Sequence, residues 1–173
     1  PASPAYGENL RLWSEIDPEG HKLFSQGGPA GILSNISLSP SKVGLDNLRC
    51  TCNGGTIYLY SQSDPEREAD DWFKKLELSG ASVLYVYGIG LGYYYDAAKK
   101  WLEEDPRRSI VFLEDEPGIV EAFLQTERCS TLLHDPQATL FYRPAVDNEL
   151  LKELALVHAE SNHTFSCLRT YQK

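Results

Sequence analysis

One stretch, VLYVYGIGLGYYYDAAKKWL at 83–102, limits what this chain can fold into more than any other. It begins with apolar and aromatic residues typical of a buried strand and continues through Gly88, Gly90 and Gly92. Apolar residues then recur at helical spacing (Tyr94, Ala98 and Leu102), so the stretch predicts a strand, a glycine turn and a helix. Glycines permit positive φ and a close approach of the backbone to a ligand, and the first N–H groups of the helix point into the same space. The stretch therefore predicts either a cleft for an anionic or polar ligand or a tight turn that holds nothing.

Acidic residues follow the next apolar stretch, which predicts a second strand at 109–113. Glu114 lies 26 residues after Gly88, and in dinucleotide-binding units an acidic residue about 20 residues beyond the glycines accepts hydrogen bonds from the ribose. Tyr93 stands where a G-x-G-x-x-G fingerprint has its last glycine, which disfavours NAD and makes an S-adenosylmethionine-type turn the nearer comparison. The predicted cofactor-binding residues are Gly88, Gly90, Gly92, Tyr93, Glu114 and Asp115.

Residue patterns predict the other elements. Before the central stretch they indicate helices at 5–16 and 18–24, an irregular segment at 26–40, a β-hairpin with strands at 47–52 and 56–60, and a helix capped by Asp64 with Pro65 at its first position. After residue 114 they indicate a helix around 119–124, a loop at 129–136, a strand at 138–142 and a last helix at 148–160.

These elements predict an α/β fold. We expect a Rossmann-like, three-layer half sheet with parallel strands at 83–87, 109–113 and 138–142 in the order 3-2-1, preceded by a helical segment and a β-hairpin. The predicted parts are 1–62 and 63–173, forming one compact unit. Only three βα units follow residue 83, so the second half of a doubly wound sheet, and with it the usual ligand position, is not expected. A complete methyltransferase is disfavoured further because Val86 and Arg143 stand where such enzymes usually carry acidic residues.

Composition excludes several function classes. The net charge of −9 and the sequence pI near 4.9 disfavour nucleic acid and anionic membranes as partners. No apolar run approaches the roughly 18 residues of a membrane span, and no signal peptide is recognisable, so a cytoplasmic location is expected. His158, His163 and Cys167 match no metal-binding spacing, and no metal is expected. The sequence contains no methionine, which suggests a processed chain or a fragment.

Three runs together resemble the N-terminal domain of the Maf (motility accessory factor) family: GTIYLYSQSDPEREADDW from Gly55, then VLYVYGIGLGYYY, then FLEDE. These glycosyltransferase-like proteins are implicated in attaching nonulosonic acids to bacterial flagellins. The residues that match the three family motifs are Ser61, Asp64, Pro65, Glu68 and Ala69; Gly88, Gly90, Leu91, Gly92 and Tyr93; and Glu114. The chain departs from the family where Tyr60 replaces a histidine, Ser63 replaces a tyrosine, and Glu114-Asp115-Glu116 replaces Glu-Pro-Asp.

The resemblance implies an accessory, ligand-binding domain that is not catalytic on its own, because the family's transferase activity lies in a domain that follows this one. It implies a nucleotide-containing small molecule, such as a nucleotide-sugar, and a C-terminal catalytic domain as partners. Two other classes stay open: an S-adenosylmethionine-dependent enzyme, and a Rossmann-derived protein-interaction domain with an empty pocket. Ser61, Asp64 and Glu68 form either an accessory polar site or only the cap of a helix.

Overall fold

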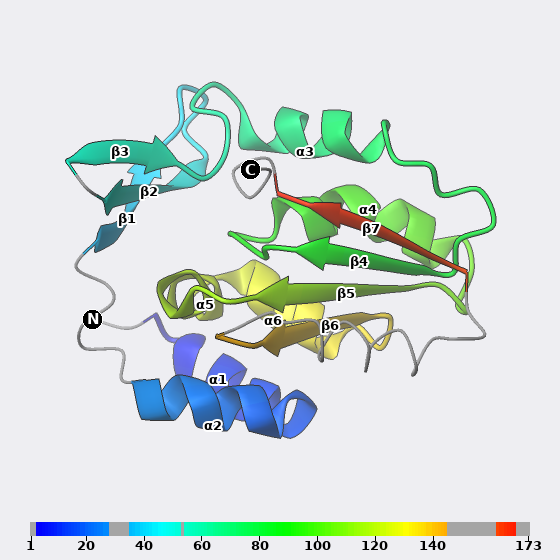
Figure 1. The fold of residues 1–173 in the computed structure, drawn as a ribbon, viewed down its shortest axis with the longest axis horizontal. Coiled ribbons are helices and arrows are strands. Elements are labelled where there is room, and N and C mark those ends of the chain that lie inside the picture. The colour runs from blue at the N-terminus through cyan, green and yellow to red at the C-terminus, as the bar shows by residue number, and fades with distance from the viewer. Residues whose placement is uncertain (1–2, 28–34, 53, 145–161, 169–173) are drawn as a thin grey trace.

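The computed structural model is an α/β fold centred on a four-stranded parallel sheet (Figure 1). It describes residues 3–27, 35–52, 54–144 and 162–168. The sheet has the order β6-β5-β4-β7, and its strands are β4 (Val83–Tyr87), β5 (Ser109–Glu114), β6 (Ala138–Tyr142) and β7 (His163–Cys167).

The fourth strand, β7, changes the predicted topology. The three predicted strands are parallel in the order 3-2-1, as expected. The prediction of a half sheet is wrong, because β7 pairs in parallel with the other side of β4 and places Cys167 beside Tyr87. The sequence HTFSC mixes polar and apolar residues and did not indicate a strand. Since neighbours of β4 now lie on both sides, the carboxyl ends of β4 and β7 form a topological switch point, where α/β sheets usually bind ligands.

The two faces of the sheet carry separate apolar clusters. Leu84, Val86 and Phe112 belong to the main core, on the side where α4 (Tyr93–Glu103), α5 (Pro117–Leu124) and α6 (Glu127–His134) lie (Figure 1). Buried residues of the second cluster belong to the opposite face: Val83, Tyr85, Val111 and Leu113. The helix predicted at 148–160 falls outside the described residues.

Helix α6 replaces most of the loop predicted at 129–136, and that prediction is wrong. The hydroxyl of Thr126 accepts the N–H of Cys129 at 3.1 Å, which caps the helix, and Cys129 and Leu132 are buried. This helix has only eight residues, and its ends are polar, so its helical pattern of apolar residues is too weak to predict it from the sequence. Burial of its short apolar face stabilises it in the folded protein.

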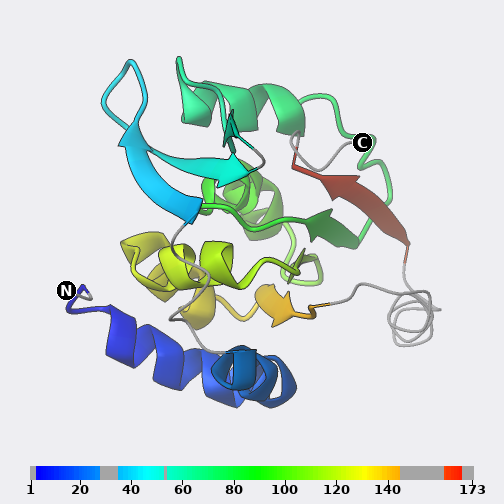
Figure 2. The ribbon, with the colours of Figure 1, turned by 60° about the vertical axis from the view of Figure 1, so that its left-hand side comes forward.

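The N-terminal helices α1 (Tyr6–Ile16) and α2 (Pro18–Gly27) confirm the two predicted helices, and both pack near β6 (Figure 2). The indole Nε1 of Trp13 donates to the carbonyl of Leu140 at 3.0 Å, and Trp13 is fully buried in the main core. The buried carboxylate of Asp17 accepts the N–H of Tyr142 at 3.0 Å and pairs with the guanidinium of Arg143 at 2.9 Å. The start of α2 is therefore tied to the carboxyl end of β6.

A second, antiparallel sheet contains β1 (Ile36–Pro40), β2 (Asp46–Cys52) and β3 (Gly55–Tyr58), and Figure 2 shows it apart from the parallel strands. The hairpin of β2 and β3 is confirmed. The irregular segment predicted at 26–40 is wrong for β1, whose serine and proline residues suggested a loop. The buried side chain of Asn47 both donates to the carbonyl and accepts the N–H of Tyr60, at 3.0 Å each, and so fixes the chain as it leaves this sheet.

Helix α3 (Pro65–Phe73) begins as predicted, with Pro65 in its first turn and the carboxylate of Asp64 accepting the N–H of Arg67 at 3.0 Å. It packs against α4 (Figure 1). The indole Nε1 of Trp72 donates to the hydroxyl of Ser166 in β7 at 2.8 Å. α3 therefore lies over the β4–β7 side of the sheet, beside the switch point.

Candidate functional site

The glycine turn between β4 and α4 has left-handed backbone conformations. Gly90 has φ +53°, and Gly92, the N-cap of α4, has φ +83°. A Cβ on Gly92 would lie 2.9 Å from the ring of Phe123. The turn therefore requires glycine for its backbone angles and for the packing around it.

The space in front of Gly90 is filled by Tyr60. A Cβ on Gly90 would lie 1.9 Å from the Tyr60 hydroxyl oxygen. That hydroxyl accepts the N–H of Leu91 at 2.8 Å and donates to the carbonyl of Ile89 at 3.2 Å. Tyr60 is fully buried, and burial raises the pKa of its hydroxyl well above the ordinary value. The backbone of the turn is thus in contact with a side chain of the protein itself, at the place where the sequence predicted a ligand.

Glu114 lies directly beside the turn, as its spacing from the glycines suggested. Its Oε2 accepts the N–H of Ile89 at 3.0 Å, while its Oε1 accepts the N–H groups of Asp115 at 3.1 Å and Glu116 at 3.0 Å. The residue has no exposed surface. This carboxylate joins the end of β5 to the glycine turn, and its predicted contact with a ribose stays a prediction.

The other two predicted residues are also engaged in packing. Asp115 accepts the hydroxyl of Tyr87 at 2.5 Å. Tyr93 donates its hydroxyl to the carbonyl of Asp46 at 2.6 Å, and the guanidinium of Arg128 lies 4.3 Å from its ring centre. Tyr93 is almost completely buried, and burial raises its pKa. These contacts hold the first turn of α4 to the small sheet and to α6.

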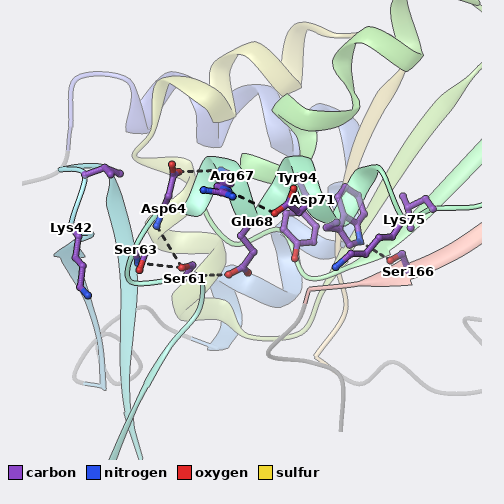
Figure 3. Close-up of a pocket in the computed structure, with 13 residues that line it drawn as sticks. Lys42, Ser61, Ser63, Asp64, Arg67, Glu68, Asp71, Lys75, Tyr94 and Ser166 are labelled. Carbon is purple, nitrogen blue, oxygen red and sulfur yellow. Dashed lines mark hydrogen bonds and ion pairs between the residues drawn. The ribbon is translucent and has the colours of Figure 1, made fainter.

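A cleft of about 930 Å³ runs along α3 (Figure 3). Ser61, Asp64 and Glu68, predicted as an accessory polar site, all line it. Its other lining residues come from the β1–β2 turn (Lys42 and Val43), the segment before α3 (Ser63), α3 and the residues just after it (Arg67, Asp71, Trp72, Lys75 and Leu76), α4 (Tyr94) and β7 (Ser166). None of the six predicted cofactor-binding residues is among the described residues that line the cleft. The residues predicted as an accessory polar site therefore border the cleft, and those predicted to bind a cofactor do not.

Hydrogen bonds order the polar end of the cleft. Glu68 Oε2 accepts the N–H of Ser61 at 2.6 Å, and the Ser61 hydroxyl accepts the N–H of Ser63 at 3.1 Å (Figure 3). Asp64 caps α3 as described above, so its predicted role as a helix cap is present together with its place in the cleft wall. The cap and the polar site are compatible because one carboxylate can have both roles.

Metal ligands are not gathered in the described parts of the chain: these residues contain no group of three or more His, Cys, Asp or Glu side chains suited to hold an ion. His163 and Cys167 lie four residues apart in β7, roughly 13 Å along the strand, too far to share one ion. His158 falls outside the described residues. Among the helices that the structure describes, none is long and apolar enough to cross a membrane.

Comparisons with known proteins give a fold likeness. No protein-family model and no curated protein matches this sequence. The structure of the MAf glycosyltransferase from Magnetospirillum magneticum AMB-1 is similar to it, with a TM-score of 0.62 and 14% identity over 95% of this chain and 32% of that one. The structure of MNMC2 from Aquifex aeolicus aligns with a TM-score of 0.42 and 15% identity over 85% of this chain and 57% of that one. The first alignment supports a shared fold, and this chain spans about a third of that protein's length.

Sequence reasoning missed three residues that shape this region: Tyr60, Trp72 and Ser166. One feature of the sequence could have drawn attention to Tyr60, since it stands where the Maf motif has a histidine. Trp72 lies on α3 and lines the cleft, and none of the motifs marked it as a site residue. Ser166 lies on the strand that was not predicted.

Proposed function

We propose that this chain is the accessory N-terminal domain of a Maf-type glycosyltransferase-like protein and is not catalytic on its own. The fold likeness to the MAf glycosyltransferase supports this proposal because it extends over 95% of this chain but only 32% of that protein. The three sequence runs that resemble the Maf N-terminal domain support it independently. The partner in this proposal is a catalytic domain supplied by the rest of a longer protein.

The observation that carries the non-catalytic part of the proposal is the position of Tyr60. Its hydroxyl bonds to the backbone of Ile89 and Leu91 and occupies the space that a nucleoside ligand would need at the glycine turn. Displacing it would leave buried polar groups unsatisfied, at a cost of about 1–3 kcal/mol each. Glu114 supports the same interpretation, because its acceptors hold backbone N–H groups.

An S-adenosylmethionine-dependent enzyme is less well supported. The methyl donor would need the space in front of the glycine turn, which Tyr60 occupies. At the end of β6, where such enzymes usually carry an acidic residue, Arg143 is instead paired with the buried Asp17.

Calorimetric titration tests the proposal with S-adenosylmethionine, free cytidine monophosphate and a cytidine-linked sugar. We expect no binding of the first two to the wild-type chain, and no release of sugar from the third when the chain is incubated with it alone. Tyr60→Ala, which removes the ring from the turn, is the matched variant. If it remains folded in a thermal melt, a nucleoside that binds it but not the wild type confirms that Tyr60 closes the site.

Two results would overturn the proposal. One is binding of S-adenosylmethionine or cytidine monophosphate to the wild type that weakens about 10-fold or more in Glu114→Gln, which would restore Glu114 as a ribose ligand. The other is turnover of the cytidine-linked sugar by the isolated chain.

A further inference from the structure

We infer that the cleft along α3 is a binding site for a polyhydroxylated small molecule of the sugar class, held against Trp72. This inference goes beyond the accessory role and does not depend on the glycine turn being closed. A volume of about 930 Å³ lies in the range of small-molecule sites, roughly 300–1,000 Å³. The cleft also borders the switch point, since Ser166 of β7 lies in its wall.

Trp72 provides an aromatic wall whose orientation is fixed. Its ring stacks on that of Tyr94 with centroids 4.1 Å apart and planes inclined by 21°, and its Nε1 donates to Ser166 at 2.8 Å. The other tryptophans, Trp13 and Trp101, are buried, whereas Trp72 is partly exposed and lines the cleft. A rigid, partly exposed indole presents apolar surface at little entropic cost, and the C–H face of a sugar ring packs well on such a surface.

Carboxylates along the same face of α3 provide acceptors for hydroxyl groups. Glu68 is positioned by its hydrogen bond from Ser61, and Asp64 by its bond from the N–H of Arg67. Asp71 lies one turn further along the helix, with the guanidinium of Arg67 at 4.0 Å and the ammonium of Lys74 at 3.9 Å, both longer than hydrogen bonds. Because its ion pairs are loose and its side chain is 53% exposed, Asp71 is the carboxylate best placed to accept from an incoming hydroxyl.

The charge of the lining selects against nucleotides. Three cationic side chains (Lys42, Arg67 and Lys75) balance three carboxylates (Asp64, Glu68 and Asp71), so the described wall has no net charge. A phosphate-bearing ligand is favoured by an excess of positive charge or by a free helix N-terminus, whereas here the N-cap of α3, Asp64, already places a carboxylate there. A neutral or zwitterionic sugar fits this balance. The carboxylates can accept hydrogen bonds from its hydroxyl groups, and the Lys and Arg N–H groups can donate to them.

NMR titration tests this inference, with glucose, N-acetylglucosamine, glucosamine and glucuronic acid as probes up to high millimolar concentration. The indole N–H signal of Trp72, assigned with Trp72→Phe, reports the site, and the signals of Trp13 and Trp101 serve as internal controls. We expect at least one sugar to shift the Trp72 signal alone. Asp71→Asn should weaken that binding about tenfold, because it removes a charged acceptor.

Asp70→Asn is the matched control, since Asp70 is the neighbouring carboxylate of the same helix, is exposed, and lies outside the described lining. We expect it to leave binding unchanged, and Ser63→Trp, which fills the cleft from an exposed position, to abolish it without loss of thermal stability. The inference is overturned if no sugar shifts the Trp72 signal. It is also overturned if Asp70→Asn weakens binding as much as Asp71→Asn, or if cytidine monophosphate shifts the signal and the sugars do not.

Discussion

The hydroxyl oxygen of Tyr60 lies 1.9 Å from the point where a Cβ on Gly90 would be. No side chain at position 90 can coexist with Tyr60 in its present place, so the glycine and the tyrosine depend on each other. The glycine turn, a motif that suggests a ligand site, is here in contact with a side chain of the same chain. This relationship leads to predictions on stability as well as on binding.

Gly90→Ala should reduce the free energy of unfolding by about 2–4 kcal/mol, since it adds the strain of a positive φ to the displacement of Tyr60. Gly80→Ala is the control, because Gly80 has φ +75° with nothing within 4 Å of its Cβ position, so only the backbone strain of roughly 1 kcal/mol applies. Urea unfolding of the two variants measures the difference. Equal losses would mean that Tyr60 does not restrict the turn.

Tyr60→Phe should cost about 1–3 kcal/mol, because the N–H of Leu91 and the carbonyl of Ile89 lose their partner in a buried site. The substitution should also change the response to alkali. Burial raises the pKa of Tyr60, so the hydroxyl stays protonated in the folded state at a pH where the unfolded chain, with a pKa near 10, ionises. Its contribution to stability is therefore fully present below about pH 10 and is lost as the pH rises above that value.

Unfolding curves at neutral pH and above pH 10 measure this effect. The loss of stability between the two conditions should be smaller in Tyr60→Phe than in the wild type, since the variant lacks one of the tyrosines whose pKa is raised in the folded state. Tyr6 and Tyr95, whose pKa values are raised by burial and by neighbouring carboxylates, still contribute in both proteins. An identical loss in both would show that Tyr60 is accessible to solvent in the folded state.

Glu114→Gln should destabilise the protein by about 2–3 kcal/mol, because three backbone N–H groups then face an amide that carries only one acceptor oxygen. Asp115→Asn is the comparison variant and should cost less, since the Asp115 side chain is partly exposed and accepts from the hydroxyl of Tyr87, an interaction that the amide oxygen of Asn can keep. Thermal melting compares them. A melting temperature of Glu114→Gln equal to that of the wild type would favour a ligand-binding role for this carboxylate over a structural one.

Asp17→Asn should cost about 3 kcal/mol, because the side chain of Arg143, 17% exposed, loses its charged partner and the contact between α2 and the end of β6 weakens. Glu19→Gln tests the exposed side of the same cation: Glu19 is 71% exposed and 3.5 Å from Arg143, so its loss should cost less than about 1 kcal/mol. Chemical unfolding of both variants decides whether the buried pair matters more, and a larger loss in Glu19→Gln would contradict this account.

The central elements could be predicted from the sequence because their patterns are local and strong. The apolar strand at 83–87, its glycines and the Asp64-Pro65 cap each have a physical reason that does not depend on the rest of the chain. β1 and β7 could not be predicted in this way. Both segments are short, and serine, threonine, histidine or proline residues stand among their apolar ones: Ile36–Pro40 and His163–Cys167. They are strands because a neighbouring strand pairs with each of them.

The site was predictable only in part, for a similar reason. The spacing of Glu114 placed it beside the glycines, but spacing does not tell whether a carboxylate binds a ligand or the backbone of its own turn. Tyr60 reaches the turn from 29 residues away along the chain, through a small sheet whose position the sequence did not indicate. Ser61, Asp64 and Glu68 were recognised from one motif because a helix start brings them together locally.

The most direct test of the central claim is a titration of the wild-type chain with cytidine monophosphate and with S-adenosylmethionine, followed through the backbone amide signals of Gly90 and Leu91. Since the Tyr60 hydroxyl already bonds to the N–H of Leu91, we predict that both signals stay unchanged as either compound is added to high millimolar concentration. A saturable shift of these two signals that is weakened in Glu114→Gln would contradict the account, because it would show that the glycine turn binds a nucleoside in the folded protein.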